Sequence, residues 1–188
     1  MNIPNTLTLL RILMIPIFMV VFYLPIEWNN RLACFIFILA GVTDILDGYL
    51  ARKLNQQSSL GAFLDPVADK IMIAVVLVIL VQQDPSLFLA LPAAIIIGRE
   101  ITISALREWM AEIGARSRVA VSGYGKLKTI MQMVALGLLI YRDDLFGILP
   151  IYALGYICLY VAVILTIWSL FQYLASAWIK IKESLVKQ

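Results

Sequence analysis

Four aspartates in an otherwise apolar stretch are the residues of this chain best suited to chemistry. Asp44, Asp47, Asp65 and Asp69 are four of only 12 acidic residues in the sequence. Each lies within or at the end of a long hydrophobic run. An ionised carboxylate at the centre of a membrane span costs about 2.5–3.5 kcal/mol on insertion scales. Four such groups therefore require a compensating partner.

The spacing places these side chains on two helical faces. The first face consists of residues at i, i+3, i+4, i+7 and i+8, namely Asp44, Asp47, Gly48, Ala51 and Arg52. The second consists of residues at i, i+4 and i+8, namely Gly61, Asp65 and Asp69. Positions with this spacing share one side of a helix. The polar linker KLNQQSS is short, so we predict an antiparallel hairpin centred near residue 56, with all four carboxylates at one depth.

Carboxylates that converge without histidine or cysteine form a hard site made only of oxygen atoms. Its natural occupant is Mg²⁺ or Mn²⁺, and the number of carboxylates suits two ions. Such ions neutralise phosphate oxygens and stabilise the attacking and leaving oxygens of an in-line displacement. Gly48 and Gly61 have no side chains, so a nucleotide or the partner helix could approach the backbone there. Arg52 can make a bidentate contact to a diphosphate.

The spacing alone leaves two other interpretations open. The aspartates could form buried ion pairs with basic residues of the same or neighbouring helices, namely Arg52, Lys53, Lys70 or Arg99. They could also line a pathway for protons or cations, where intramembrane carboxylates are equally expected. The chain contains no histidine, which excludes a Ser-His-Asp triad and a zinc site with histidine ligands. Cys34 and Cys158 each lie alone in an apolar run and are expected to pack within helices.

The composition indicates an integral membrane protein, since 62% of the 188 residues are hydrophobic and only 14% are charged. Six segments are long enough to cross a bilayer core of about 30 Å as helices, at residues 6–26, 32–53, 60–81, 87–108, 120–141 and 147–178. They are too long for strands and do not alternate. We predict one all-α domain over residues 1–188, a polytopic membrane protein with six transmembrane helices. The net charge of +3 gives no indication of a nucleic-acid partner.

The basic residues predict the orientation in the membrane. Of the 15 lysines and arginines, only Arg31 and Arg142 fall near the loops PIEWNN, QQDPS and YRDDLFG, which a six-helix arrangement puts on one side. All the others lie toward the opposite side, and residues 107–128 are the most basic stretch. The positive-inside rule therefore predicts that the N- and C-termini and the carboxylates face the cytoplasm.

The two helices with the aspartates carry a longer pattern, which reads Asp44-x2-Asp47-Gly48-x2-Ala51-Arg52-x8-Gly61-x3-Asp65-x3-Asp69. It resembles the complete signature of the CDP-alcohol phosphatidyltransferase family, and the length and six-helix layout agree over the whole chain. The resemblance implies that the four aspartates ligate the metal ions and that Asp69 is the general base toward an acceptor hydroxyl. It also implies a homodimer in the bacterial inner (cytoplasmic) membrane.

The same resemblance assigns residues to the CDP-lipid substrate. Gly48, Arg52 and Gly61 would hold the diphosphate and the cytidine, with Ser58 as a further polar contact. A polar stripe on the first helix consists of Asn5, Thr8 and Arg11. This stripe either reaches the nucleotide or lies at the membrane interface, and we expect the first, with Asn5 and Thr8 as nucleotide contacts.

Two further segments narrow the choice of acceptor. NIPNTLTLLR near the N-terminus and GREITISALREWM resemble bacterial members of the family that use sn-glycerol 3-phosphate. The implied reaction converts CDP-diacylglycerol and glycerol 3-phosphate into phosphatidylglycerophosphate and CMP. Inositol phosphate, serine and phosphatidylglycerol stay open as alternative acceptors within the family.

An anionic acceptor needs cations at the cytoplasmic mouth of the site. We predict Arg107, Arg118 and Lys126 for this role, although each could equally anchor the chain at anionic headgroups. Lys128 and, deeper in the fourth helix, Arg99 are further cations of this region. One face of that helix, made up of Glu100, Ser104 and Glu108, is expected to orient the arginine side chains.

Overall fold

The computed structural model describes residues 3–54, 58–112, 123–144 and 150–185. These residues form six helices and no strand, which confirms the all-α prediction for this part of the chain. The helices are α1 (Ile3–Tyr23), α2 (Asn29–Lys53), α3 (Ser59–Gln83), α4 (Leu87–Glu112), α5 (Gly123–Tyr141) and α6 (Ile151–Leu185).

Prolines explain where α1 ends and where α6 begins. α1 ends at Tyr23, although the hydrophobic run continues to residue 26. Pro25 cannot donate a backbone hydrogen bond, and it disfavours helical geometry at the preceding Leu24. α6 begins directly after Pro150, whose carbonyl accepts a hydrogen bond from the backbone N–H of Leu154 at 3.1 Å. Proline is tolerated at a helix N-terminus because backbone N–H groups there have no acceptor within the helix, so a missing N–H costs little.

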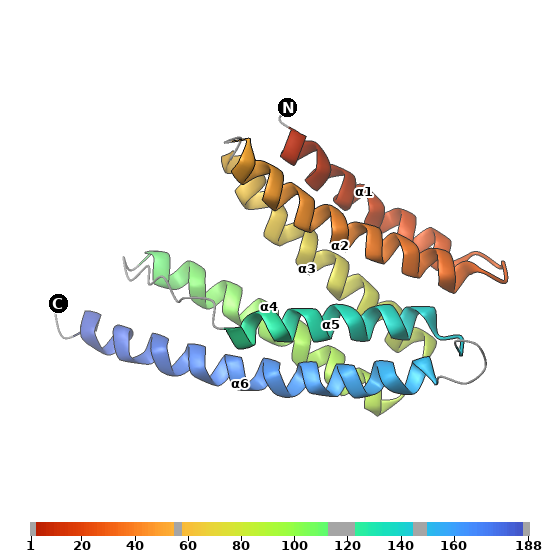
Figure 1. The fold of residues 1–188 in the computed structure, drawn as a ribbon. Helices are drawn as coiled ribbons and strands as arrows, with labels where there is room; N and C mark the ends of the chain where they lie inside the picture. Colours follow the sequence, from red (N-terminus) through yellow and green to blue (C-terminus); the bar gives the residue numbers. More distant parts are fainter. Residues whose placement is uncertain (1–2, 55–57, 113–122, 145–149, 186–188) are drawn as a thin grey trace.

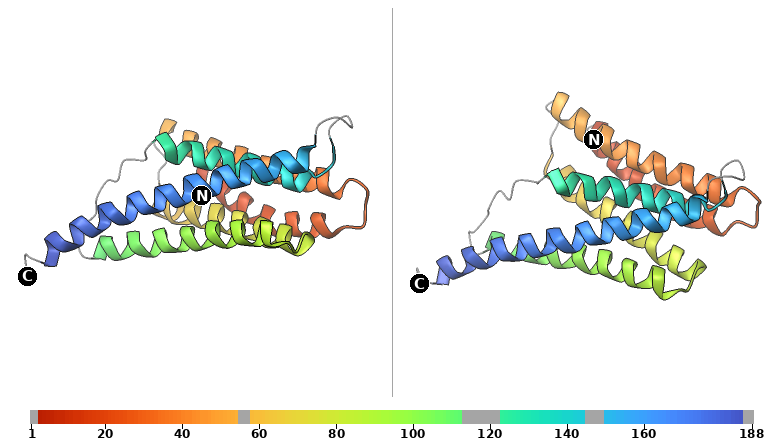
Figure 2. Two further views of the ribbon diagram at one scale, coloured as in Figure 1. Left: turned by 90° about the horizontal axis from the view of Figure 1, so that it is seen from below. Right: turned by 60° about the horizontal axis from the view of Figure 1, so that its bottom comes forward.

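The six helices form a bundle of two groups (Figures 1 and 2). α1 packs on α2 and α3, while α6 packs on α4 and α5. The groups meet where α2 contacts α5 and where α3 contacts both α4 and α5. The start of α1, the end of α2, the start of α3 and the end of α6 lie toward one end of the bundle, which we call the termini end (Figure 1).

Several helices have the properties of membrane spans. Within the described residues, four are long and apolar enough to cross a bilayer, namely Asn5–Tyr23, Asn29–Lys53, Leu87–Glu112 and Ile151–Ala175. The described apolar part of α5, Leu127–Tyr141, is shorter. Large apolar side chains also face outward, such as Ile45, Leu87 and Phe88, which are 72%, 73% and 72% exposed. The structure therefore supports a multi-pass membrane protein, and the predicted count of six spans stays a prediction.

Apolar side chains from all six helices fill the centre of the bundle. The largest fully buried ones are Phe18, Phe37, Leu77, Leu89, Ile96, Leu136, Leu139, Ile140 and Leu159. Between helices in a bilayer, such burial improves packing but removes little surface from water, because lipid is also apolar. Polar contacts between helices therefore gain weight in deciding how the helices lie against one another.

One set of polar contacts lies away from the termini end, where α3 ends. The hydroxyls of Tyr156 and Tyr152 donate to Asp84 Oδ2 at 2.6 and 2.7 Å, which joins α6 to the end of α3. These two hydrogen bonds stabilise the charged carboxylate and lower the pKa of Asp84 below its usual range. Arg31 and Asp143 form an exposed ion pair at 3.2 Å that joins the start of α2 to the segment after α5.

Candidate active site

The polar stripe of α1 is buried against α2 and α3. The side chains of Asn5, Thr8 and Arg11 recur about once per turn, and these residues are only 8%, 1% and 2% exposed. Each contacts a polar group of α2, of α3 or of the N-terminal cap of α3. The stripe therefore packs against the aspartate region, and its contact with the nucleotide stays a prediction.

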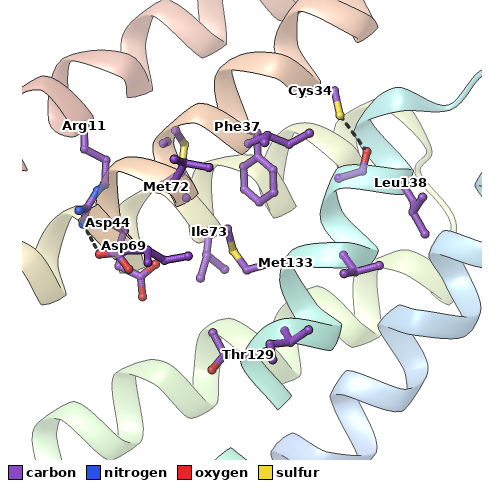
Figure 3. Close-up of a pocket in the computed structure, with 18 of the residues that line it drawn as sticks. Arg11, Cys34, Phe37, Asp44, Asp69, Met72, Ile73, Thr129, Met133 and Leu138 are labelled. Atoms are coloured by element: carbon purple, nitrogen blue, oxygen red, sulfur yellow. Dashed lines mark hydrogen bonds and ion pairs between the residues drawn. The ribbon is translucent and has the colours of Figure 1, made fainter. Parts of the chain in front are cut away.

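Arg11 provides the compensating charge that the aspartates require. Its Nη1 lies 2.6 Å from Asp44 Oδ1, and its Nη2 donates to Asp47 Oδ2. Figure 3 shows the guanidinium reaching down from α1 to Asp44. Asp47 is buried, whereas the side chain of Asp44 is 46% exposed. A single arginine thus holds two carboxylates of α2 on one side of the site.

The basic residues that the sequence suggested as ion-pair partners lie elsewhere or have other contacts. Lys70 donates to Ser104, and Arg99 pairs with Glu100 at 2.6 Å. Lys53 lies over the ring of Tyr49, and Arg52 is exposed in the last turn of α2. The ion-pair interpretation was therefore right about the need for a cation and wrong about its source. The cation comes from α1, which lies far away in the sequence.

Thr8 connects the two aspartate-bearing helices. Its hydroxyl donates to Asp65 Oδ1 at 2.6 Å and lies 3.4 Å from Asp47 Oδ2. Asp47 and Asp65 therefore lie within reach of the same hydroxyl group, as the predicted hairpin requires for residues equidistant from its turn. The structure thus agrees with the predicted closeness of this pair, although α2 and α3 pack mainly on α1 rather than on each other.

Ser58 starts α3 and joins it to α1. As the N-cap residue, its side chain accepts a hydrogen bond from the backbone N–H of Gly61 at 3.0 Å, a common way to satisfy a free helix N–H. Its hydroxyl also donates to Asn5 Oδ1 at 2.7 Å. A Cβ on Gly61 would lie 2.8 Å from that same Asn5 oxygen. Gly61 is therefore needed here for close packing of α1 on α3.

Asp69 lies at the polar end of a cavity of about 950 Å³ between α2, α3 and α5. Arg11, Asp44 and Asp69 gather at this end, whereas Cys34 and Leu138 lie at the other (Figure 3). The walls between the two ends are mostly apolar, and include Phe37, Ile38, Met72, Ile73, Ile130 and Met133. The cavity therefore suits a molecule with a charged head and an apolar body.

The donor set has the right chemistry for a divalent cation, although it is not assembled as a finished site. Among the residues that the structure describes, no group of three acidic or cysteine side chains is gathered closely enough to hold a metal ion. Three of the carboxylates are instead linked in pairs, Asp44 with Asp47 through Arg11 and Asp47 with Asp65 through Thr8. Oxygen ligands of this kind suit Mg²⁺ or Mn²⁺, and metal ligation by the four aspartates stays a prediction.

The structure shows fewer contacts for the other predicted site residues. A Cβ on Gly48 would meet no other atom within 4 Å, so the backbone there borders open space. Arg52 and Arg107 are exposed on α2 and α4. Arg118 and the side chain of Lys126 lie outside the part of the chain that the structure describes.

A second charged cluster lies between α4, α5 and α6. Glu100 pairs with Arg99 at 2.6 Å and with Lys128 at 2.7 Å. Arg99 also donates to Ser169 at 3.3 Å, and Lys128 is only 5% exposed. The charges of Glu100 and Lys128 act on Asp69, as do those of Asp44 and Arg11. The sequence identified these cations as available, but it favoured the more exposed Arg107 over them.

Comparison with known proteins identifies relatives over nearly the whole chain. The model of the CDP-alcohol phosphatidyltransferase family matches residues 1–168. A Sodalis glossinidius protein named CDP-diacylglycerol–glycerol-3-phosphate 3-phosphatidyltransferase is 54% identical over 178 residues, covering 94% of this chain and 95% of its own. Proteins of the same name from Haemophilus influenzae and Escherichia coli K12 are 54% and 51% identical over 176 residues, covering 94% of this chain and 93% and 94% of their own.

Gly61→Ala is expected to destabilise the protein, because the new Cβ displaces Asn5 from Ser58. Overpacking of this kind costs about 1–3 kcal/mol, and each kcal/mol lowers Tm by about 2–4 °C in a chain of this size. Thermal denaturation of the purified protein in detergent measures the effect. Gly48→Ala is the matched control, since its Cβ meets open space and alanine favours a helix. Equal losses of Tm in both variants would contradict the packing argument.

Proposed function

The chain belongs to the CDP-alcohol phosphatidyltransferase family, and we propose that it transfers the phosphatidyl group of CDP-diacylglycerol to sn-glycerol 3-phosphate. The products would be phosphatidylglycerophosphate and CMP. The names of relatives that are 51–54% identical over 94% of the chain support this choice of substrates. The structural observation that carries the proposal is the pair of carboxylates, Asp44 and Asp69, at one end of an apolar cavity.

The cavity accounts for the two chemical halves of the lipid donor. Its charged end, with Arg11, Asp44 and Asp69, would receive the diphosphate, and its apolar walls would receive acyl chain. From Asp44 to Cys34 the cavity follows ten residues of α2, which corresponds to about 15 Å along the helix axis. A donor held there keeps its tails at bilayer depth. We infer that the lipid enters sideways between α2 and α5.

Asp69 is proposed as the general base. In the reaction, the acceptor hydroxyl attacks the phosphorus that carries the diacylglycerol, and the bond from that phosphorus to the CMP oxygen breaks. The Asp69 carboxylate takes the proton of the attacking hydroxyl. The position of Asp69 supports this role, because it lines the charged end of the cavity.

A divalent metal ion, Mg²⁺ or Mn²⁺, or a pair of such ions, would be held by the carboxylates of Asp44, Asp47, Asp65 and Asp69. When bound, it would supply positive charge to the diphosphate oxygens. The protein's own contribution is to hold these carboxylates in place, through Thr8 toward Asp65 and through the packing of α1 on the hairpin.

The nucleotide of the donor would lie at the termini end of the hairpin. Gly48 supports this placement, because its backbone borders open space, and Arg52 is exposed nearby for contact with the diphosphate. The N-cap cluster, made up of Asn5, Ser58 and Gly61, lies beside Thr8 on the same side of α1. These residues are proposed to bind CDP.

Arg99 and Lys128 are proposed to bind the phosphate of the acceptor. Both are cations paired with Glu100, and Lys128 is buried, so its charge is little screened by water. Arg107, Arg118 and Lys126, which the sequence suggested for this role, would then attract the anionic acceptor to the cytoplasmic mouth. This arrangement brings the acceptor to Asp69 from the side of α4, while the donor lies between α2 and α5.

The proposed membrane topology adds the number of spans and their orientation to the multi-pass helical fold. We propose six spans with both termini in the cytoplasm of a bacterial cell, so that water-soluble glycerol 3-phosphate reaches the termini end. The asymmetry of the basic residues supports this orientation. A homodimer in the inner (cytoplasmic) membrane is proposed from the family resemblance alone. Ion transport is less well supported, because the cavity walls beyond Asp44 and Asp69 are apolar.

CMP release from CDP-diacylglycerol is expected to require glycerol 3-phosphate and a divalent metal ion. The assay offers the purified protein glycerol 3-phosphate, inositol phosphate, serine, phosphatidylglycerol or unphosphorylated glycerol, with Mg²⁺, with Mn²⁺ or with EDTA. Glycerol should be a poor acceptor, since it offers no phosphate to the cations beside Asp69. Faster CMP release with another alcohol would overturn the choice of acceptor, and full activity in EDTA would overturn the role of a metal.

Asp69→Asn is expected to lower kcat by about 10²–10⁴-fold, the usual contribution of a general base, while the protein stays folded. CMP release under saturating substrates measures kcat, and the melting temperature checks the fold. Asp143→Asn is the control, because Asp143 lies outside the cavity lining and pairs with an exposed arginine. Retention of more than a tenth of the wild-type kcat by Asp69→Asn would argue against the assignment of the base.

Gly137→Leu should fill the apolar cavity and weaken binding of long-chain donor. Gly137 lines the cavity, and a Cβ there would meet no other atom within 4 Å, so the first atom of the new side chain fits without a clash, and the melting temperature checks that the whole side chain leaves the fold intact. We expect KM for long-chain CDP-diacylglycerol to rise roughly tenfold, or ~1.4 kcal/mol, with a smaller rise for a short-chain donor. Gly98→Leu is the matched control on the exposed side of α4. Equal KM values in the two variants would show that acyl chains bind elsewhere.

A further inference from the structure

We propose that Arg11 is a resident counter-ion of the carboxylate site. It neutralises Asp44 and Asp47 when no divalent ion is bound, and it releases them when an ion binds. This inference rests on the metal-binding part of the proposed function. It makes Arg11 a positioning residue that prepares the site and competes with the ion.

The first support is the place of Arg11 in the fold. Its side chain is 2% exposed, and its two charged contacts are Asp44 and Asp47, both predicted metal ligands. Burial of an arginine in a membrane helix is costly unless its charge is paired. The two carboxylates have the converse problem, because without a cation nearby their charges would repel. The pairing therefore stabilises the metal-free fold from both sides.

The second support is that the pairing is incomplete. The Nε of Arg11 is buried and has no hydrogen-bond partner. Nη1 lies close to Asp44 Oδ1, at 2.6 Å, yet it is not oriented to make a hydrogen bond. A guanidinium that serves only to join helices usually uses its planar fork in paired hydrogen bonds, and buried polar groups are rarely left unpaired. Arg11 is held mainly by charge, which another cation can replace.

The third support is that the guanidinium and a metal ion cannot hold the same oxygens together. An ion coordinated by Asp44 and Asp47 would lie within a few ångströms of Nη1 and Nη2, where two positive charges repel strongly in a buried site. Arg11 also lines the cavity together with Asp44 and Asp69. The displaced side chain therefore has open space beside its present position and need not leave the site (Figure 3).

Mn²⁺ binding to the purified full-length protein tests this competition directly. Isothermal titration, or the EPR signal of free Mn²⁺, gives the Kd for wild type, Arg11→Met and Arg11→Lys. Without the competing guanidinium, Arg11→Met should bind Mn²⁺ about tenfold more tightly or better, the size expected for loss of about one charge-assisted hydrogen bond. Arg11→Lys keeps the charge but lacks the fork, so its Kd should fall between the other two. Arg31→Met controls for the loss of an arginine, because Arg31 is exposed and pairs with Asp143, away from the aspartate site.

Thermal denaturation provides the second readout. In EDTA, Arg11→Met should melt below wild type, because Asp44 and Asp47 have lost their counter-ion. Saturating Mn²⁺ should remove most of that difference, since a ligand that binds only the folded state stabilises it. If Arg11→Met is too unstable to purify, Arg11→Lys carries the test. The inference is overturned if both variants bind Mn²⁺ no more tightly than wild type, or if the deficit in Tm is the same with and without Mn²⁺.

Failure of this inference can be told apart from failure of the proposed function. Wild type that binds Mn²⁺ and releases CMP, with variants that bind no more tightly, would leave the function intact and reduce Arg11 to a structural residue. Wild type without saturable Mn²⁺ binding would overturn both the metal site and the competition. CMP release by that same preparation would then show whether the transferase proposal survives without them.

Discussion

The contact of Arg11 with Asp44 and Asp47 is the interaction on which the rest of the site depends. In a bilayer, apolar burial discriminates poorly between helix arrangements, because lipid is as apolar as the side chains. Polar contacts therefore have a large part in deciding how α1 lies on the hairpin. Asn5, Thr8 and Arg11 make these contacts in turn along one buried face. The contacts that hold α1 on the hairpin thus also hold three of the aspartates, Asp44, Asp47 and Asp65.

The helices divide the work of the proposed reaction between two groups that meet at Asp69. The cavity for the donor lies between α2, α3 and α5. The cations proposed for the acceptor come from α4 and α5, with α6 in support. α5 serves both sides, because Thr129 and Met133 line the cavity while Lys128 points to Glu100. A change in the position of α5 would therefore affect both substrates at once.

The sequence predicts well whatever depends on helical period and on short connections. The six helices and the closeness of Asp47 to Asp65 follow from spacing alone, and Thr8 confirms that closeness. The partner of Asp44 does not follow, because Arg11 is on another helix, and its contact depends on how α1 is rotated against α2. Candidates chosen from the hairpin and its neighbouring helix were wrong for this reason. The cavity and the Glu100–Lys128 pair likewise depend on packing between distant segments, which a one-dimensional pattern does not specify.

The central claim is that carboxylates from α2 and α3 share a metal ion in the working protein. Anomalous diffraction from crystals grown with saturating Mn²⁺ tests this most directly, because the signal locates manganese without reference to activity. We expect an anomalous peak in direct coordinating contact with oxygens of both helices, with the Arg11 side chain turned away from Asp44 and Asp47. Ordered carboxylates without a peak beside them, or manganese bound only elsewhere, would contradict the account.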